Sequence, residues 1–455
     1  GFIVSALTSL FIPQLLGPEA YGYWQLYLLY NGYMLYFSFG LTDGIQVRYG
    51  GRKFETIDPS VISGQFWLLF GLNTILNLSI VAIFFQTAPE EGKALAMVFA
   101  ALAGVVAVTR SLITMLLQAT NRMKVAATSV MIERLLFVLV ILLILFVPML
   151  MGEGLGELQY FHVMAADFAG KLISFFYVIW QNKKLVFSKP PEVKEVFHEA
   201  RLNMSVGLRI VLAALGIVFG IGFLRQAIEA RWGIETFAQV SISLSLASMF
   251  MLFVNALSVV LFPALRRQDP QTLPSLYAEL ETLTVMVLSF LLIFYEPFRL
   301  ILRYFLPSYE QGLIYMGLLF PIFLFDGKMS LLITTYLKAL NRPTQLLISN
   351  ALSFALSLIL SFLITRGILP LTGAILGILG VQMIRTIAGE LFLGFAKPWK
   401  AIGRELTLTI SFILLTHYLG GFKAPLAYLP IYLVFLYFAR QDLKGVIQRL
   451  KGAKK

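Results

Sequence analysis

The stretch VAATSVMIERLLFVLVILLILFVP at residues 125–148 decides the fold class. It is long and apolar enough to cross the hydrocarbon core of a bilayer as a helix, which takes about 20 residues. The whole chain shares this character, since 58% of its 455 residues are hydrophobic and 13% are charged, against about 25% charged in ordinary soluble domains. A soluble fold would expose much of this apolar surface to water. The sequence therefore predicts a polytopic membrane protein.

Fourteen stretches of this kind follow one another with short loops between them. They predict an all-α membrane protein of about 14 transmembrane helices, with no room for a soluble domain. The chain opens at Gly1 inside an apolar stretch, without a Met or a basic lead-in, so we expect further residues upstream and no cleavable signal peptide. The predicted spans are 1–16, 22–42, 60–86, 94–117, 125–148, 158–181, 203–225, 236–262, 277–296, 311–336, 344–364, 371–395, 405–420 and 426–439.

Basic residues gather in every second loop, which predicts the orientation of the chain. Lys and Arg accumulate in cytoplasmic loops of membrane proteins, so both termini are expected in the cytoplasm. This asymmetry also accounts for the net charge of +12 without a nucleic-acid partner. Examples are Arg48, Arg52 and Lys53, then Lys183, Lys184 and Lys189, then Arg266 and Arg267, and finally Lys338 and Arg342.

The connection 182–202 is the longest of the basic ones and divides the chain after six predicted helices. An internal repeat supports this division, because the turn at Gln118–Arg122 is echoed 220 positions later by the turn at Lys338–Arg342. We expect two six-helix lobes related by a parallel repeat, a pattern typical of transporters. The predicted parts are an N-lobe at 1–181, a cytoplasmic linker at 182–202, a C-lobe at 203–395, and helices 13 and 14 with a basic tail at 396–455.

Charged residues inside the predicted spans are the first candidates for function, because charge at membrane depth is costly and usually faces a bundle interior or a wet cavity. The cations are expected to bind an anionic group such as a phosphate or diphosphate through charge-assisted hydrogen bonds. Snorkelling to the cytoplasmic interface is the alternative for Arg110 and Arg209. The predicted diphosphate ligands are Arg48, Arg110, Arg134, Lys171, Arg209, Lys328 and Arg385.

Local partners and a helix break are also predicted from this set. Asp167 and Lys171 are four residues apart and share a helix face, so we expect an ion pair between them. Glu133 and Arg134 are adjacent and point apart, which leaves Arg134 in need of another partner. Pro321 removes a backbone hydrogen bond shortly before Asp326 and Lys328, so the span is expected to break at membrane depth.

A second candidate group lies in the tyrosine-rich span 22–42. Tyr23, Tyr27, Tyr30 and Asn31 fall on one helical face, where aromatic rings can stack on sugars and phenol groups can hydrogen-bond hydroxyls. The alternative is an interfacial aromatic belt combined with ordinary packing.

Several classes of chemistry are not expected. The chain has no Cys and three His far apart in sequence, which excludes disulfides and thiolate sites and leaves no metal-binding spacing. It has no GxxxxGK[ST] motif, so no P-loop ATPase is expected. No cofactor is predicted, and energy is expected from the membrane potential or from a coupling ion, Na⁺ or H⁺. The candidate carboxylates for that ion are Asp43, Asp167 and Asp326.

The beginning of the chain carries a family resemblance. The stretch Leu16–Gly22, followed by the aromatic helix and by Gly40–Gly44 through Arg48, resembles the opening of Wzx-type oligosaccharide flippases. These are polysaccharide biosynthesis proteins of the multidrug/oligosaccharidyl-lipid/polysaccharide (MOP) exporter superfamily. The resemblance implies a cationic cavity and a multi-pass protein of a bacterial or archaeal plasma membrane. It further implies alternating access that moves polyprenyl-diphosphate-linked oligosaccharide from the inner to the outer leaflet.

The partners implied are this glycan lipid, membrane lipids and other polysaccharide assembly proteins. Two alternatives share the architecture, namely a lipid II flippase and a multidrug or cation antiporter. A membrane glycosyltransferase or polymerase is the enzyme alternative, but such enzymes usually carry a long outer loop, and the outer loops here are short. The sequence therefore predicts a transporter and not an enzyme.

Overall fold

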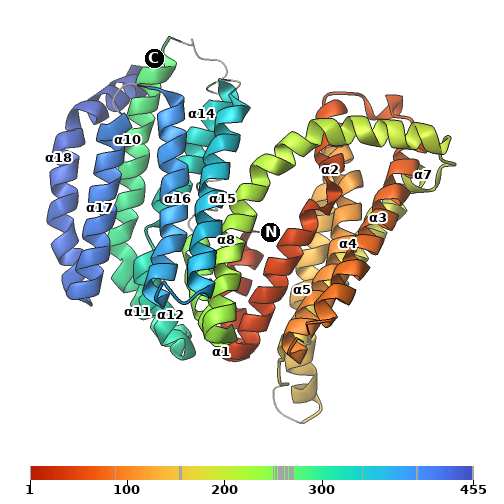
Figure 1. Ribbon diagram of the computed structural model, residues 1–455, viewed down its shortest axis with the longest axis horizontal. Helices are drawn as coiled ribbons and strands as arrows, with labels where there is room; N and C mark the ends of the chain where they lie inside the picture. The colour runs from red at the N-terminus through yellow and green to blue at the C-terminus, as the bar shows by residue number, and fades with distance from the viewer. Residues whose placement is uncertain are drawn as a thin grey trace. The chain divides into compact units, whose positions relative to one another are not determined.

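The computed structural model describes residues 2–87, 89–152, 156–249, 271–340, 342–395 and 398–452, with four isolated positions between 250 and 270. Every regular element among these residues is a helix, so the predicted all-α membrane fold is confirmed (Figure 1). Eight of the described helices are long and apolar enough to cross a membrane, or nine if one bent pair counts as a span. Arg266, Arg267 and much of 250–262 lie outside the described residues.

The chain forms two compact units, Gly1–Phe219 and Gly220–Lys455. The first unit begins with α1, which holds two helices joined at Gly17, where φ is 72°. This kink explains how one long element covers two predicted spans. The helices of the first unit are α1 (Phe2–Met34), α2 (Leu41–Arg48), α3 (Pro59–Phe85), α4 (Glu91–Ala119), α5 (Met123–Leu150), α6 (Tyr160–Gln181), α7 (Lys183–Phe187) and the first part of α8 (Val193–Met249), with short turns η1 (Leu35–Ser38) and η2 (Phe54–Thr56).

The second predicted span, 22–42, ends earlier than expected. Regular α-helix stops at Met34, and Phe39 and Gly40 adopt left-handed conformations, with φ of 47° and 79°. Left-handed conformations of this kind end helices and favour glycine. A new short helix, α2, then starts at Leu41.

The helix α2 packs backbone to backbone against the first part of α8. A Cβ atom added at Gly44 would lie 1.8 Å from the carbonyl oxygen of Asn203, and one added at Gly207 would lie 1.8 Å from that of Gly40. These contacts join Asn203 and Gly207 to α2 and its N-cap, and the first unit extends beyond the predicted linker at 182–202, to Phe219. The predicted lobe boundaries themselves stay a prediction.

The loop that leads into α3 shows how the helix begins. The carboxylate of Asp58 accepts hydrogen bonds from the Ser60 backbone N at 2.8 Å and from its Oγ at 2.7 Å. These bonds lower the pKa of Asp58 below its usual value. They also satisfy a backbone N–H group at the start of α3, which has Pro59 in its first turn.

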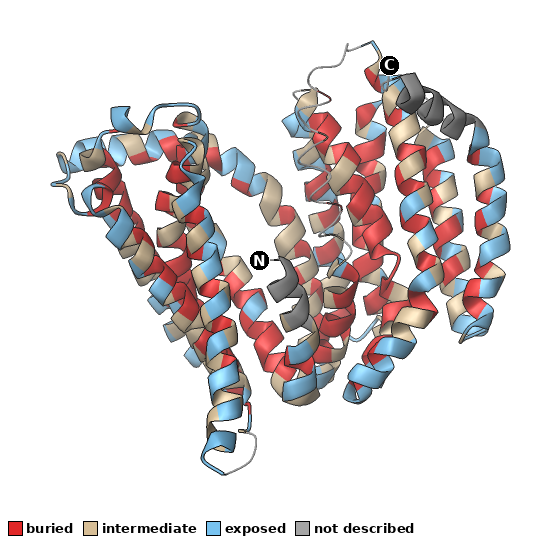
Figure 2. Cartoon of the chain, turned by 180° about the vertical axis from the view of Figure 1, so that it is seen from behind, coloured by how far each residue is buried: buried red, intermediate tan, exposed pale blue. Residues whose placement is uncertain are grey.

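The second unit starts within α8, which bends at Gly233, where φ is 85°. Its buried residues, like those of the first unit, run along the sides of the helices that face one another (Figure 2). The later helices are α10 (Leu273–Leu291), α11 (Tyr295–Phe305), α12 (Glu310–Leu319), α13 (Ile322–Lys328), α14 (Thr334–Ala339), α15 (Pro343–Thr365), α16 (Leu371–Leu393), α17 (Pro398–Tyr418) and α18 (Lys423–Gly452), with short turns η3 (Leu292–Phe294) and η4 (Pro307–Tyr309).

The predicted break near Pro321 is confirmed. The helical segments Pro307–Leu319 and Ile322–Ala339 meet at a bend of 49°, as expected where proline interrupts the hydrogen-bond ladder. A π-helical turn, η5 (Met329–Ile333), follows directly after Lys328. The break and the π-turn therefore flank the short helix that carries Asp326 and Lys328.

The close contact between α2 and α8 yields a stability prediction. Gly207→Ala places a Cβ where backbone oxygen already lies, so one helix must shift, at a cost of at least the ~1–3 kcal/mol of core overpacking. We expect a clearly lower melting temperature in detergent, measured by fluorescence-detected size exclusion. In the matched control Gly32→Ala, nothing lies within 4 Å of the added Cβ, and stability should be unchanged or slightly higher. Equal melting temperatures for both variants would contradict this packing.

Candidate functional site

The first unit contains a buried network of charged side chains from three helices. Arg110 of α4 forms an ion pair with Glu133 of α5 at 2.7 Å. Lys171 of α6 lies 3.8 Å from the other oxygen of Glu133 and forms a second ion pair with Asp167. The Tyr27 hydroxyl of α1 donates a hydrogen bond to Asp167. The predicted pair between Asp167 and Lys171 is thereby confirmed.

A glycine makes the short distance between α5 and α6 possible. A Cβ atom added at Gly170 would lie 2.7 Å from the backbone oxygen of Glu133, so only glycine permits this approach. Arg110 also donates a hydrogen bond to Ser174 of α6, whose Oγ donates to the backbone oxygen of Ser129 at 2.8 Å. The network contains two cations and two carboxylates, so its formal charges cancel.

The second unit contains a different network, centred on a fully buried lysine. Lys328 of α13 forms ion pairs with Glu405 of α17, with Glu390 of α16 at 3.0 Å and with Glu281 of α10 at 3.6 Å. Arg404 of α17 binds Glu281 at 2.5 Å. The hydroxyl of Tyr277 donates to Glu390. Four helices thus meet at one ammonium group.

The formal charges of this second network do not cancel, because three carboxylates face two cations. A cavity of about 320 Å³ reaches the network and is lined in part by Glu281, Glu390, Lys400 and Arg404. Among the described residues there is no group of three or more His, Cys, Asp and Glu arranged to hold a metal ion. An excess carboxylate beside a cavity can take up a proton or a monovalent cation.

Of the residues in this network, Lys328 alone was among the predicted site residues, and Tyr277, Glu281, Glu390, Arg404 and Glu405 were not. Glu281 lies inside the predicted span 277–296, and Glu405 is the first residue of the span 405–420. Charged residues near the ends of spans are usually solvated, so the sequence gives no reason to expect that these two are buried. The signal that identifies Glu281 is its place one turn after Tyr277, on the same helix face.

The other predicted cations have differing surroundings. Arg385 lies 3.6 Å from Asp326 and donates to Asn350 Oδ1 at 2.9 Å. Arg48 binds Glu199 at 3.0 Å and Asn203 Oδ1 at 2.7 Å.

Arg134 is half-buried and Arg209 is exposed, and neither has a carboxylate within ion-pair distance among the residues that the structure describes. Within the described part of the first unit, both arginines can therefore bind an anion that the protein itself does not supply.

The four predicted sugar contacts are buried inside the first unit. Tyr23 donates to Glu90 at 3.4 Å, Tyr27 to Asp167, and Asn31 to the backbone oxygen of Ala100 at 3.4 Å. The ring of Tyr30 lies edge-on to Phe84, with 6.0 Å between centroids. Each side chain has a protein partner here, and contact with sugar stays a prediction.

The three predicted coupling carboxylates also differ. Asp167 is engaged by Lys171 and Tyr27, and Asp326 lies beside Arg385. Asp43 is half-buried in α2 and accepts a hydrogen bond from Thr42 at 3.3 Å. No cation lies within ion-pair distance of Asp43 in the described part of the chain.

Comparisons with known proteins identify the fold. No protein-family model and no curated protein matches the sequence. An inward-facing multidrug resistance MATE family transporter of the MOP superfamily has a TM-score of 0.68 at 14% identity, over 90% of this chain and 96% of that chain. The lipid II flippase MurJ, in an inward closed conformation, has a TM-score of 0.66 at 14% identity, over 97% of both chains.

A MOP superfamily transporter from Pyrococcus furiosus has a TM-score of 0.51 at 14% identity, over 89% of this chain and 92% of that chain. At such identities the likeness shows the fold alone. The chain has the fold of MOP superfamily transporters.

The Lys328 network yields a prediction about folding. Lys328→Met leaves three buried carboxylates with one cation, and removing one partner of a buried ion pair costs about 3–5 kcal/mol. We expect a large loss of thermal stability in detergent.

Two further variants test the cause of that loss. Adding Glu405→Gln to Lys328→Met restores the net charge of the network and should recover part of the stability. The control Lys423→Met changes an exposed lysine and should have little effect. A double variant no more stable than Lys328→Met alone would show that charge balance is not what Lys328 provides.

Proposed function

We propose that this chain is a flippase that moves a polyprenyl-diphosphate-linked oligosaccharide from the inner to the outer leaflet by alternating access. The fold supports transport, since it is shared with a multidrug transporter and with a lipid II flippase. Because the fold accommodates both kinds of substrate, the substrate class must be argued from this chain's own residues.

The observation that carries the proposal is the availability of two arginines in membrane helices. Arg134 in α5 and Arg209 in α8 have no carboxylate partner among the described residues. A guanidinium at membrane depth is retained where it meets water or an anion, and its planar fork matches phosphate oxygens. These two residues are therefore the proposed diphosphate ligands.

The remaining cations have a second role in this proposal. Each of them binds a carboxylate in this structure, so a phosphate would have to displace that partner; they are Arg48, Arg110, Lys171, Lys328 and Arg385. We propose that they hold the helices in register, and that contact with the diphosphate by any of them requires the ion pairs to open.

A second candidate function is cation-coupled extrusion of an organic cation. It is favoured by the three carboxylates Glu281, Glu390 and Glu405 in the second unit, which outnumber their cations, and by the cavity that reaches Glu281 and Glu390.

The proposal predicts a transport defect without a folding defect. In a deletion strain, lipid-linked sugar should accumulate on the cytoplasmic leaflet, and the wild-type chain should clear it. Arg134→Ala and Arg209→Ala should lower export about tenfold or more, since a hydrogen bond to a charged group contributes about 1.5–3 kcal/mol. Their melting temperatures should stay near wild type because no buried carboxylate is left unpaired.

Lysine at either position should retain part of the export, since the charge survives while the fork is lost. Full export by both alanine variants would remove these arginines from the site. Wild-type uptake of organic cations into vesicles, without any glycan-lipid flipping, would establish the second candidate instead.

Energy coupling is the next part of the proposal. A cytoplasm-negative potential favours outward movement of net negative charge by about 2.3 kcal/mol per charge per 100 mV, and Na⁺ or H⁺ returning on a carboxylate would add to this. Asp43 is the favoured carrier, since Asp167 and Asp326 already face cations. Flipping in reconstituted vesicles should respond to an imposed potential or ion gradient, and Asp43→Asn should weaken the ion response more than Asp326→Asn. Rates indifferent to both driving forces would indicate passive scrambling.

A further inference from the structure

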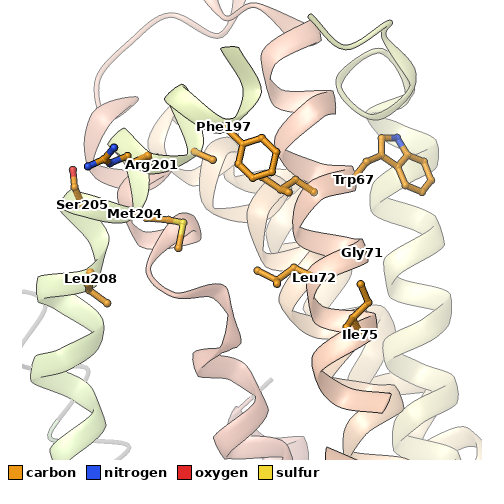
Figure 3. Close-up of a pocket in the computed structure, with 11 residues that line it drawn as sticks. Trp67, Gly71, Leu72, Ile75, Phe197, Arg201, Met204, Ser205 and Leu208 are labelled. Carbon is orange, nitrogen blue, oxygen red and sulfur yellow. The ribbon is translucent and has the colours of Figure 1, made fainter. Parts of the chain in front are cut away.

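A groove in the first unit lies between α3 and the first part of α8 (Figure 3). Its volume is about 770 Å³, and all but two of the residues that line it are apolar. The helix α3 and this first part of α8 both belong to the unit Gly1–Phe219. The groove is separate from the charged network of Arg110, Glu133, Asp167 and Lys171, none of which lines it.

The spacing of residues along α8 explains why one of its faces is apolar. Phe197, Met204 and Leu208 recur at intervals of seven and four residues, which places them on one side of a helix. On the opposite wall, Trp67 and Ile75 of α3 are 46% and 66% exposed. Within a membrane, such a surface is in contact with hydrocarbon.

The groove has one cation at its rim. Of the described residues that line it, Arg201 is the one with a charged side chain, and Ser205 lies one turn further along the same face. Arg201 is exposed and has no carboxylate within ion-pair distance among the described residues. It lies near the start of α8, which the basic loops assign to the cytoplasmic side.

A glycine keeps the groove open on the α3 side. Gly71 lies between Trp67 and Ile75 on the lining face, and nothing lies within 4 Å of a Cβ atom built on it. A side chain at this position would enter the groove without meeting the protein. Helix interiors disfavour glycine by about 1 kcal/mol relative to alanine. The structure shows no packing contact that requires a glycine at position 71, so its effect here is to leave the groove open.

We propose that this groove binds an anionic phospholipid of the cytoplasmic leaflet, with an acyl chain along Trp67, Gly71 and Met204 and the phosphate on Arg201. The apolar walls match a hydrocarbon chain, and basic residues beside membrane helices at the cytoplasmic face recognise anionic headgroups. A single guanidinium matches the single charge of a phosphodiester. A diphosphate carries more negative charge than one guanidinium compensates, so we assign the groove to phospholipid and not to the flipped substrate.

The bound lipid would join two elements that differ in their role. The wall formed by α3 belongs to the first unit throughout, whereas α8 is the helix through which the chain passes into the second unit. Occupancy of the groove would fix the first part of α8 against α3 and add hydrocarbon contacts that the protein itself does not make there.

The natural fluorescence of Trp67 provides the test. The full chain is reconstituted in vesicles that contain a small fraction of either bromine-labelled phosphatidylglycerol or bromine-labelled phosphatidylcholine, because bromine on an acyl chain quenches tryptophan on contact. Subtracting the signal of Trp67→Phe isolates the contribution of Trp67 from the other four tryptophans. We expect phosphatidylglycerol to quench at an about fivefold lower mole fraction than phosphatidylcholine, the preference expected from one basic residue at the surface.

Three variants complete the experiment. Arg201→Gln should abolish the preference for phosphatidylglycerol, and Arg201→Lys should retain most of it. Gly71→Leu should reduce quenching by both lipids, whereas the matched control Gly380→Leu, also open within 4 Å, should not. Equal quenching by the two lipids in the wild type would overturn the proposal, because the groove would then meet bulk lipid without selection.

Displacement of brominated phosphatidylglycerol by an equal fraction of polyprenyl diphosphate would also overturn it, since the occupant would then be the substrate's own lipid. The measurement reports lipid contact and not transport, so its result is independent of the proposed flippase activity.

Discussion

Compensation of charge inside the membrane is the constraint on which the rest of this structure depends. An ionised side chain taken out of water must find an opposite charge or a polar cavity, and in each unit this requirement fixes which helix faces meet. Arg110, Glu133 and Lys171 set the rotation of α4, α5 and α6 about their axes. Lys328 does the same for α10, α13, α16 and α17, because each carboxylate that it binds comes from a different helix.

This constraint also separates structural charges from those that remain available for a substrate. A cation whose partner is a buried carboxylate contributes to the fold, and its loss exposes that carboxylate to an apolar environment. A cation with no such partner remains available to bind an anionic substrate. By the presence of a carboxylate partner among the described residues, the seven basic residues of the sequence analysis divide into two groups. Arg134 and Arg209 have none, and the other five are paired.

Much of the fold could be predicted from the sequence, because hydropathy and proline act locally. The helical spans, the break at Pro321 and the pair of Asp167 with Lys171 all depend on residues near one another in the chain. Long-range partners could not be predicted in this way. Nothing in the local sequence of Glu405 shows that it lies against Lys328, 77 positions earlier.

The tyrosine-rich span shows the same limit of local patterns. Tyr27 shares a helical face with Tyr23, Tyr30 and Asn31, as expected, but its partner is Asp167, 140 positions later. The contact of Gly207 with Gly40 likewise has no signature apart from two small residues. The parts of the candidate site that depend on residue spacing could be predicted from the sequence. The parts that depend on tertiary packing could not.

The π-helical turn Met329–Ile333 has a consequence for the length of this segment. Lys328 and Tyr336 are eight residues apart, and in a regular α-helix their side chains would diverge by roughly 80°. The π-turn absorbs one residue, so both face the same core, where the Tyr336 ring lies 5.0 Å from that of Tyr277. The direction in which the side chains of α14 point therefore depends on the one extra residue in the π-turn. Deletions or insertions of one residue here would turn the following helix by roughly 100°, so the number of residues in this segment matters as much as their identity.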